Sequence, residues 1–90
     1  MKPCLTYPWI EISADAERVI DTRTDEPITI YRRKIRGQEY CGIMIEGRRV
    51  STWLLAAEAW CGPRPVGQGA RALAAWNERV KVTRKRAKRG

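Results

Sequence analysis

The chain has 90 residues, 43% of them apolar, and a formal net charge of +8, so it can form one small domain with a modest core. It contains no histidine, which excludes Ser-His-Asp and Cys-His catalysis, His-ligated zinc and a His general base. We therefore expect no enzyme, no metal site and no cofactor.

The three cysteines, Cys4, Cys41 and Cys61, are an odd number with wide spacing. This pattern fits neither a disulfide framework nor a zinc knuckle, and it indicates reduced thiols. The N-terminus lacks the pattern of a signal peptide, and no apolar run approaches the ~20 residues needed to cross a bilayer. The sequence therefore predicts a soluble cytoplasmic protein with no membrane partner.

In chain order, the first predicted elements are short strands. Residues 9–12 and 18–20 have strand-like composition, and 13–16 between them are typical of a turn. Residues 25–27, Asp-Glu-Pro, predict the next break.

Three longer strands are expected next. Residues 28–36 are rich in β-forming residues, and 37–38 turn the chain into a strand over 40–45. Glu-Gly at 46–47 predicts a two-residue hairpin turn into a third strand that starts at 48–50. In the middle strand, period-2 alternation places three side chains on one face: Cys41, Ile43 and Ile45.

The clearest helix follows, with Ser51 or Thr52 as its N-cap and Gly62-Pro63 as its end. Its apolar stripe at helical spacing consists of Trp53, Leu54, Ala57, Trp60 and Cys61. After a loop over 63–69, a second helix is predicted over 70–82. Its inward-facing residues are Leu73, Trp76 and Val80. We interpret the tryptophans on these stripes as core residues rather than as a platform for bases.

These elements predict a small α+β domain. An antiparallel sheet of three or more strands is packed by a Trp-rich helix, and a second, C-terminal helix leads to a basic tail. Residues 1–82 form the single domain, and 83–90 form the tail, which we expect to be flexible. The sequence leaves open whether the helix continues into this tail.

The net charge lies almost entirely in the last third of the chain. Residues 1–63 contain 9 basic and 9 acidic residues, whereas 64–90 contain 9 basic residues and Glu78 alone. A run of like charges repels itself unless a polyanion screens it, and nucleic acid is the commonest such partner. The alternative is a solubilising tail without a ligand. The candidate phosphate-binding residues here are Lys81, Arg84, Lys85, Arg86, Lys88 and Arg89.

A second basic cluster lies on the predicted hairpin, with four cations on one strand and two on what we take to be its neighbour. A two-stranded ribbon fits the major groove of DNA, where Arg reads guanine, although phosphate contacts are the commoner outcome. The alternative is that these charges protect an edge strand from self-pairing. The residues are Arg32, Arg33, Lys34, Arg36, Arg48 and Arg49.

Residues 42–67 read GIMIEGRRVSTWLLAAEAWCGPRPVG. This stretch resembles the phage and intron-homing HNH endonucleases, in which a strand, a Gly-basic-basic turn and a helix precede a Gly-Pro-Arg-Pro loop. Residues 7–13, with Arg18 and Val19 after them, resemble the small DNA-binding repeat that often precedes that domain.

Two departures limit what the resemblance implies. Trp53 stands where the family usually has its first His, and 68–71, Gln-Gly-Ala-Arg, replace the His-containing run that holds the catalytic metal. The resemblance thus implies shared architecture and nucleic-acid binding, but not nuclease activity.

We therefore expect a non-catalytic, phage-type nucleic-acid-binding protein, with duplex DNA favoured over RNA, in the host cytoplasm if it is phage-encoded. The alternative is a small phage-type regulator whose basic surface meets an acidic patch of a host or phage protein.

Overall fold

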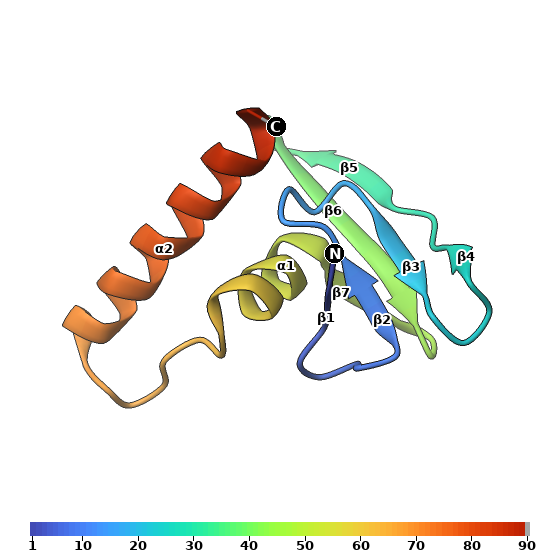
Figure 1. Ribbon diagram of the computed structural model, residues 1–90. Helices are drawn as coiled ribbons and strands as arrows, with labels where there is room; N and C mark the ends of the chain where they lie inside the picture. The colour runs from blue at the N-terminus through green and yellow to red at the C-terminus, as the bar shows by residue number, and fades with distance from the viewer. Residues whose placement is uncertain (90) are drawn as a thin grey trace.

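The computed structural model describes residues 1–89, with side chains as far as Ala87. It contains a four-stranded and a three-stranded antiparallel sheet and two helices (Figure 1). The α+β class predicted from the sequence is confirmed.

The first sheet is a meander with the strand order β1-β2-β3-β4. Its strands are β1 (Lys2–Pro3), β2 (Ile10–Ile12), β3 (Val19–Asp21) and β4 (Glu26–Pro27). Ile10, Ile12 and Val19 are buried, so the middle of this sheet faces the core. The segment 25–27, predicted as a break, contains the short strand β4, which pairs with β3.

The second sheet has the order β5-β6-β7, and two tight turns join its strands. The strands are β5 (Tyr31–Ile35), β6 (Gln38–Ile45) and β7 (Arg48–Ser51). In each turn both central residues have a positive φ: 53° and 80° at Arg36 and Gly37, and 50° and 80° at Glu46 and Gly47. Type I′ hairpins require this conformation, and Gly adopts it without steric cost. The second turn was predicted correctly, whereas the first lies one residue before the predicted position.

Helix α1 (Thr52–Cys61) begins where the sequence predicts. The Leu54 amide donates to the Ser51 hydroxyl at 3.5 Å, and at the other end the Gly62 amide donates to the Glu58 carbonyl at 2.9 Å. The predicted apolar stripe is wrong in part, because Leu54 is 40% exposed. The buried residues are Thr52, Leu55, Ala56 and Ala57, and of these only Ala57 belongs to the predicted stripe. The reason is that α1 contacts both sheets on one side and α2 on the other.

Helix α2 (Ala70–Arg89) is longer than predicted. It continues past Val82 through the segment expected to form a flexible tail, and this corrects the predicted helix end. Ala, Lys and Arg are strong helix formers, and cations in the last turn interact favourably with the negative end of the helix dipole. Residue 90 lies outside the described residues.

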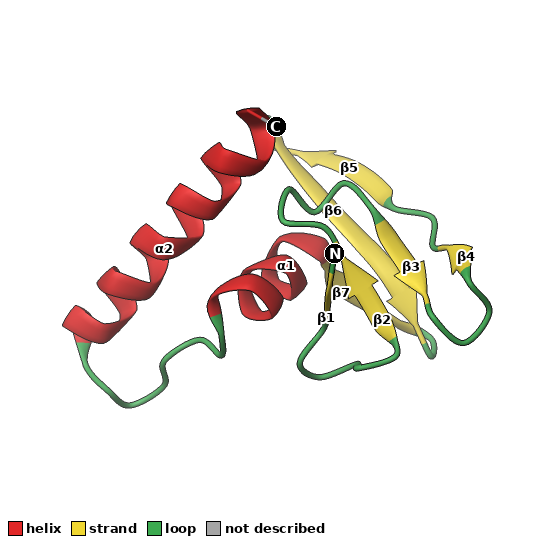
Figure 2. Cartoon of the chain, viewed as in Figure 1, coloured by secondary structure: helices red, strands yellow, loops and turns green. Residues whose placement is uncertain are grey.

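The two sheets and α1 share one core. Its buried residues are Cys4, Ile10, Ile12, Ala16, Val19, Ile43, Ile45, Leu55 and Ala56. A smaller cluster of Ala57, Trp76 and Val80 joins α1 to α2, as predicted for the inward face of the second helix. Helix α1 thus lies between the strands and α2 (Figure 2).

Each tryptophan of the helices makes at least one specific contact. The indole of Trp60, which is half-buried, donates to the Ile12 carbonyl at 3.1 Å. The indole of Trp76 donates to the Gly62 carbonyl at 3.0 Å. The guanidinium carbon of Arg84 lies 4.2 Å from the centre of the Trp53 ring. Together these contacts join α1 to the first sheet and α2 to α1.

The loop between β2 and β3 is closed by a carboxylate. Asp15 accepts hydrogen bonds from the Ser13 hydroxyl at 2.6 Å and the Glu17 amide at 3.0 Å. The hydrogen bond from Ser13 is the main reason that the pKa of Asp15 lies below its ordinary value.

The three cysteines are free thiols, and Cys4 is fully buried. Burial, with a smaller effect of the negative charge of Glu58, raises the pKa of Cys4 to about 11. Its thiol is therefore protonated at neutral pH and behaves as a core residue.

Candidate nucleic-acid interface

The strand register divides the side chains of the second sheet between two faces. Ile43 and Ile45 point into the core, and Val50, opposite Ile43, packs against it. The next residues along each strand point the other way, because side chains alternate in a strand. This outer face carries Tyr31, Arg33, Ile35, Tyr40, Met44 and Arg49.

The outer face is exposed throughout. Tyr31 is 58% exposed, Tyr40 is 51% exposed, and Met44 is 41% exposed. Among the described residues no helix or second layer of strands packs on this face, since α1 and the first sheet lie on the core side. An uncovered sheet face with large aromatic and apolar side chains is a candidate contact surface.

One feature of the predicted basic hairpin is corrected by this arrangement. The strands that carry its arginines, β5 and β7, are not neighbours, because β6 lies between them. Tyr31 and Ile35 share the outer face with Arg33, because all three follow the same alternation.

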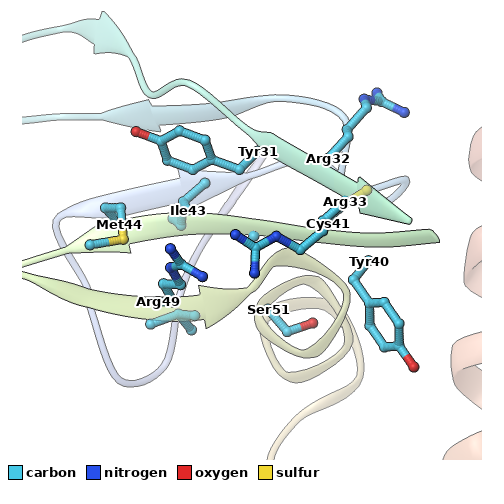
Figure 3. Close-up of a pocket in the computed structure, with 11 residues that line it drawn as sticks. Tyr31, Arg32, Arg33, Tyr40, Cys41, Ile43, Met44, Arg49 and Ser51 are labelled. Carbon is cyan, nitrogen blue, oxygen red and sulfur yellow. The ribbon is translucent and has the colours of Figure 1, made fainter. Parts of the chain in front are cut away.

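Arg33 and Arg49 reach over β6 from the two flanking strands. Figure 3 shows each guanidinium turned inward, toward the middle of the sheet and toward the other. Both side chains line one hollow on this face. Neither forms an ion pair with any residue whose side chain is described. Two unpaired positive charges that point at a common space attract an anion, and a guanidinium presents planar donors that suit phosphate.

The hollow between them has a volume of about 570 Å³, and Gly42 lies in its floor. Gly42 is opposite Tyr31 on one side and Ser51 on the other, and it contributes no side chain to the face. A Cβ at this position would lie 3.1 Å from the Val50 carbonyl oxygen, so β6 and β7 approach closely here. Glycine within a strand often marks a close approach of backbone or ligand.

Edge protection accounts for the presence of cations on β5 and β7 but not for the convergence of this pair. Of the described strands, β5 and β7 each pair only with β6, so both are edge strands as the alternative interpretation requires. Inward-pointing charges on an edge strand are one of the devices that protect it, so this interpretation also covers Arg33 and Arg49. What it does not require is that the two guanidinium groups turn toward each other over β6 (Figure 3).

The other four residues of the predicted cluster do not converge with this pair. Arg32 borders the hollow, but its guanidinium turns away from Arg33 and Arg49 and pairs with Glu17 and with Glu39, the latter at 3.1 Å (Figure 3). The hydrogen bonds that Arg32 donates to these two carboxylates, first the one to Glu17, raise the pKa of Arg32. Lys34 and Arg48 are exposed, and by strand alternation they belong to the face opposite Arg33 and Arg49. Arg36 lies in the β5–β6 turn.

The basic residues of the C-terminal segment lie on α2, and the structure brings none of the described ones to the outer face of the second sheet. Lys85 and Arg86 are exposed, whereas Lys81 lies 3.7 Å from the carboxylate of Glu78. Arg84 packs on Trp53, and this burial lowers its pKa. Lys88 and Arg89 belong to the helix, but their side chains lie outside the described residues.

Sequence reasoning missed Tyr31 and Tyr40 as candidate site residues. A sequence signal for a shared face was present. Tyr31, Arg33 and Ile35 alternate with Arg32 and Lys34, and this strand is joined by a predicted turn to a second strand with alternating side chains. Only the register shows that the aromatic residues lie on the uncovered face.

No described helix is long and apolar enough to span a membrane. No group of three or more His, Cys, Asp or Glu side chains among the described residues is arranged to hold a metal ion.

The chain was also compared with known proteins. No protein family, no curated protein and no solved structure matches it. Its function is therefore inferred from its own side chains and their arrangement.

Proposed function

We propose that this chain is a non-catalytic, phage-type nucleic-acid-binding protein that uses the outer face of β5–β7 and the basic end of α2. The observation that carries the proposal is the inward convergence of Arg33 and Arg49 over β6, without acidic partners among the described side chains. An anion that lies between the two guanidinium groups is attracted by both charges.

A polyanion suits the chain better than a single small anion. The net charge is +8, and further exposed cations, Lys85 and Arg86, lie on α2. Each neutralised phosphate of a nucleic acid releases condensed counterions, and this term adds over many contacts. We favour DNA over RNA because residues 42–67 resemble part of a DNA endonuclease family. Duplex DNA carries the denser line of phosphates for α2 to contact.

Titration by electrophoretic mobility shift tests this proposal. The ligands are a duplex DNA, a single-stranded DNA and an RNA of matched length, each at two salt concentrations. We expect binding that weakens as salt rises. The double variant Arg33→Glu, Arg49→Glu should bind DNA at least tenfold more weakly, because phosphate contacts become repulsive. The double variant Lys34→Glu, Arg48→Glu is the matched control. It makes the same charge change on the same two strands, at positions that alternate toward the opposite face. Equal losses in both variants, or no binding by the wild type, would contradict the proposal.

The non-catalytic part of the proposal has its own test. Without histidine, metal-assisted hydrolysis would depend on clustered carboxylates, and the resemblance to a nuclease family breaks where that family has its His residues. Purified protein incubated with plasmid and magnesium, manganese or zinc should leave the plasmid intact. Cleavage that survives purification and is abolished by a chelator would show the protein to be a nuclease.

A second candidate function is regulation of a host or phage protein through an acidic patch. The exposed apolar side chains of Tyr31, Ile35 and Met44 on the outer face favour it, because protein interfaces bury such groups. If Arg33→Glu, Arg49→Glu retains full DNA affinity but loses a protein recovered from host lysate, this second candidate is the better one.

A further inference from the structure

The two tyrosines of the outer face lie diagonally across the β5–β6 pair, one on each strand. In Figure 3 the rings of Tyr31 and Tyr40 point apart, and the guanidinium groups of Arg33 and Arg49 occupy the middle. Building on the proposed function, we propose that this face binds two consecutive unpaired nucleotides of a DNA strand. One base lies on each tyrosine ring, and the linking phosphate lies between the arginines.

The order of groups along the face matches the order of groups along a nucleic-acid strand. Tyr31 is level with Gly42 of β6, and Tyr40 lies two residues away on the same face of that strand. Diagonal neighbours of this kind have Cβ atoms about 7 Å apart, and these rings diverge further. Aromatic, cationic and aromatic groups thus follow one another as base, phosphate and base do. The hollow over Gly42 provides room at the position of the phosphate.

The exposed rings select unpaired over paired nucleotides. In a duplex each base face is covered by the next base pair, and a protein meets only base edges and phosphates. An unpaired base offers its π-face, on which a tyrosine can stack. Tyr31 is 58% exposed and Tyr40 is 51% exposed, so both rings have free surface for such a contact. The Tyr40 hydroxyl donates to Gln38 at 3.0 Å, which helps to hold its ring in place.

A nucleotide also fits this face better than an acidic protein segment does. The carboxylates of Asp and Glu would satisfy Arg33 and Arg49, but these side chains have no flat surface to cover the flanking rings. A nucleotide carries a flat aromatic base and an anion in adjacent positions. The occupant that satisfies both features of the face is therefore an unpaired stretch of DNA.

The first experiment tests the stacking contact by removing the tyrosine ring from the protein and, separately, the bases from the DNA strand. Affinity is measured for wild type and Tyr31→Leu with a single-stranded DNA, with the same strand made abasic at consecutive positions, and with a duplex. Leucine keeps apolar volume at an exposed site without a π-face. We expect Tyr31→Leu to weaken binding of the intact strand about tenfold and binding of the abasic strand and the duplex less than about twofold. Tyr40→Leu should behave in the same way.

The second experiment tests the phosphate position. Arg33→Gln and Arg49→Gln should each weaken binding of the single strand, and together they should flatten its salt dependence. Lys34→Gln and Arg48→Gln lie one residue away on the same strands and make the same charge change. These controls should lose clearly less affinity. Circular dichroism melting checks that every variant folds like the wild type.

The outcomes separate this inference from the proposed function. If the wild type binds no nucleic acid, the proposed function fails, and the inference fails with it. Two outcomes overturn only the inference, in a wild type that does bind DNA. In one, Tyr31→Leu weakens binding of the duplex and of the single strand equally, and in the other it weakens binding of neither. If Tyr31→Leu keeps full DNA affinity but loses binding of a Glu-rich peptide, the face belongs to an acidic protein partner, and this too overturns the inference.

Discussion

The guanidinium carbon of Arg84 lies 4.2 Å from the ring centre of Trp53, and this contact holds the basic half of α2 against the start of α1. Arg84 is therefore unlike the other described cations of the segment. Its charge is partly buried, which lowers its pKa, and its role is to position the helix. Lys85 and Arg86 remain exposed beside it and are free to meet a ligand.

Removal of this cation–π interaction should destabilise the protein modestly. Arg84→Gln is expected to lower the free energy of unfolding by about 1 kcal/mol, the usual size of such an interaction at a partly exposed site. The control Lys85→Gln should change it by less than about 0.5 kcal/mol, as expected for an exposed residue that packs on no neighbour. Urea unfolding followed by circular dichroism measures both. Equal effects would mean that Arg84 does not dock the helix.

The exposed cations of α2 should determine part of the salt dependence of binding. The double variant Lys85→Gln, Arg86→Gln should reduce the slope of log affinity against log salt by about 2, because each phosphate that is no longer neutralised lowers it by about 0.9. These substitutions are cleaner than a deletion of 84–90, which would also remove Arg84 from Trp53. An unchanged slope on duplex DNA would show that α2 does not bind the phosphates.

The packing of the two helices should depend on Trp76. This residue is 5% exposed, and its indole donates to the Gly62 carbonyl at 3.0 Å. Trp76→Ala should cost about 3–5 kcal/mol, which is enough to unfold a domain of this size, whereas Trp76→Phe should cost about 1–2 kcal/mol for the missing hydrogen bond and smaller ring. Chemical unfolding at neutral pH measures the difference. A Trp76→Phe variant as unstable as Trp76→Ala would show that the hydrogen bond dominates.

Asp15 should make the stability depend on pH in the acid range. Its pKa in the folded state lies below the ordinary value of 3.8, so the ionised carboxylate stabilises the fold at pH values above about 4. That contribution is lost as the pH falls through the lowered pKa. Asp15→Asn should therefore lower stability by about 1 kcal/mol at pH 7, and the difference from wild type should shrink below pH 3.8. A difference that stays constant with pH would contradict this assignment.

Local patterns predicted individual elements more accurately than relations between elements. The Glu46-Gly47 turn, the buried face of Ile43 and Ile45, and the inward residues of α2 follow from turn chemistry and periodicity. The exposure of Leu54 does not, because it depends on α1 contacting two layers at once.

The candidate site illustrates the same limit. Alternation places Arg33 and Arg49 each on one of two faces, but the face that is left uncovered depends on where α1 and the first sheet pack. The position of β6 between β5 and β7 depends on long-range pairing. Tyr31 and Tyr40 therefore emerged as candidate residues only from the structure.

The close approach at Gly42 also affects how mutational surveys of this protein would read. A side chain there would occupy space in the hollow between the arginines and, at 3.1 Å from the Val50 carbonyl oxygen, would require β7 to move by a few tenths of an ångström. Substitutions at position 42 would thus change the packing of the strands and the hollow together. A mutational scan that ranks residues by how well they tolerate substitution would classify Gly42 as a residue required for folding. The function of the open space above Gly42 can be tested only by substituting neighbouring side chains whose change the fold tolerates.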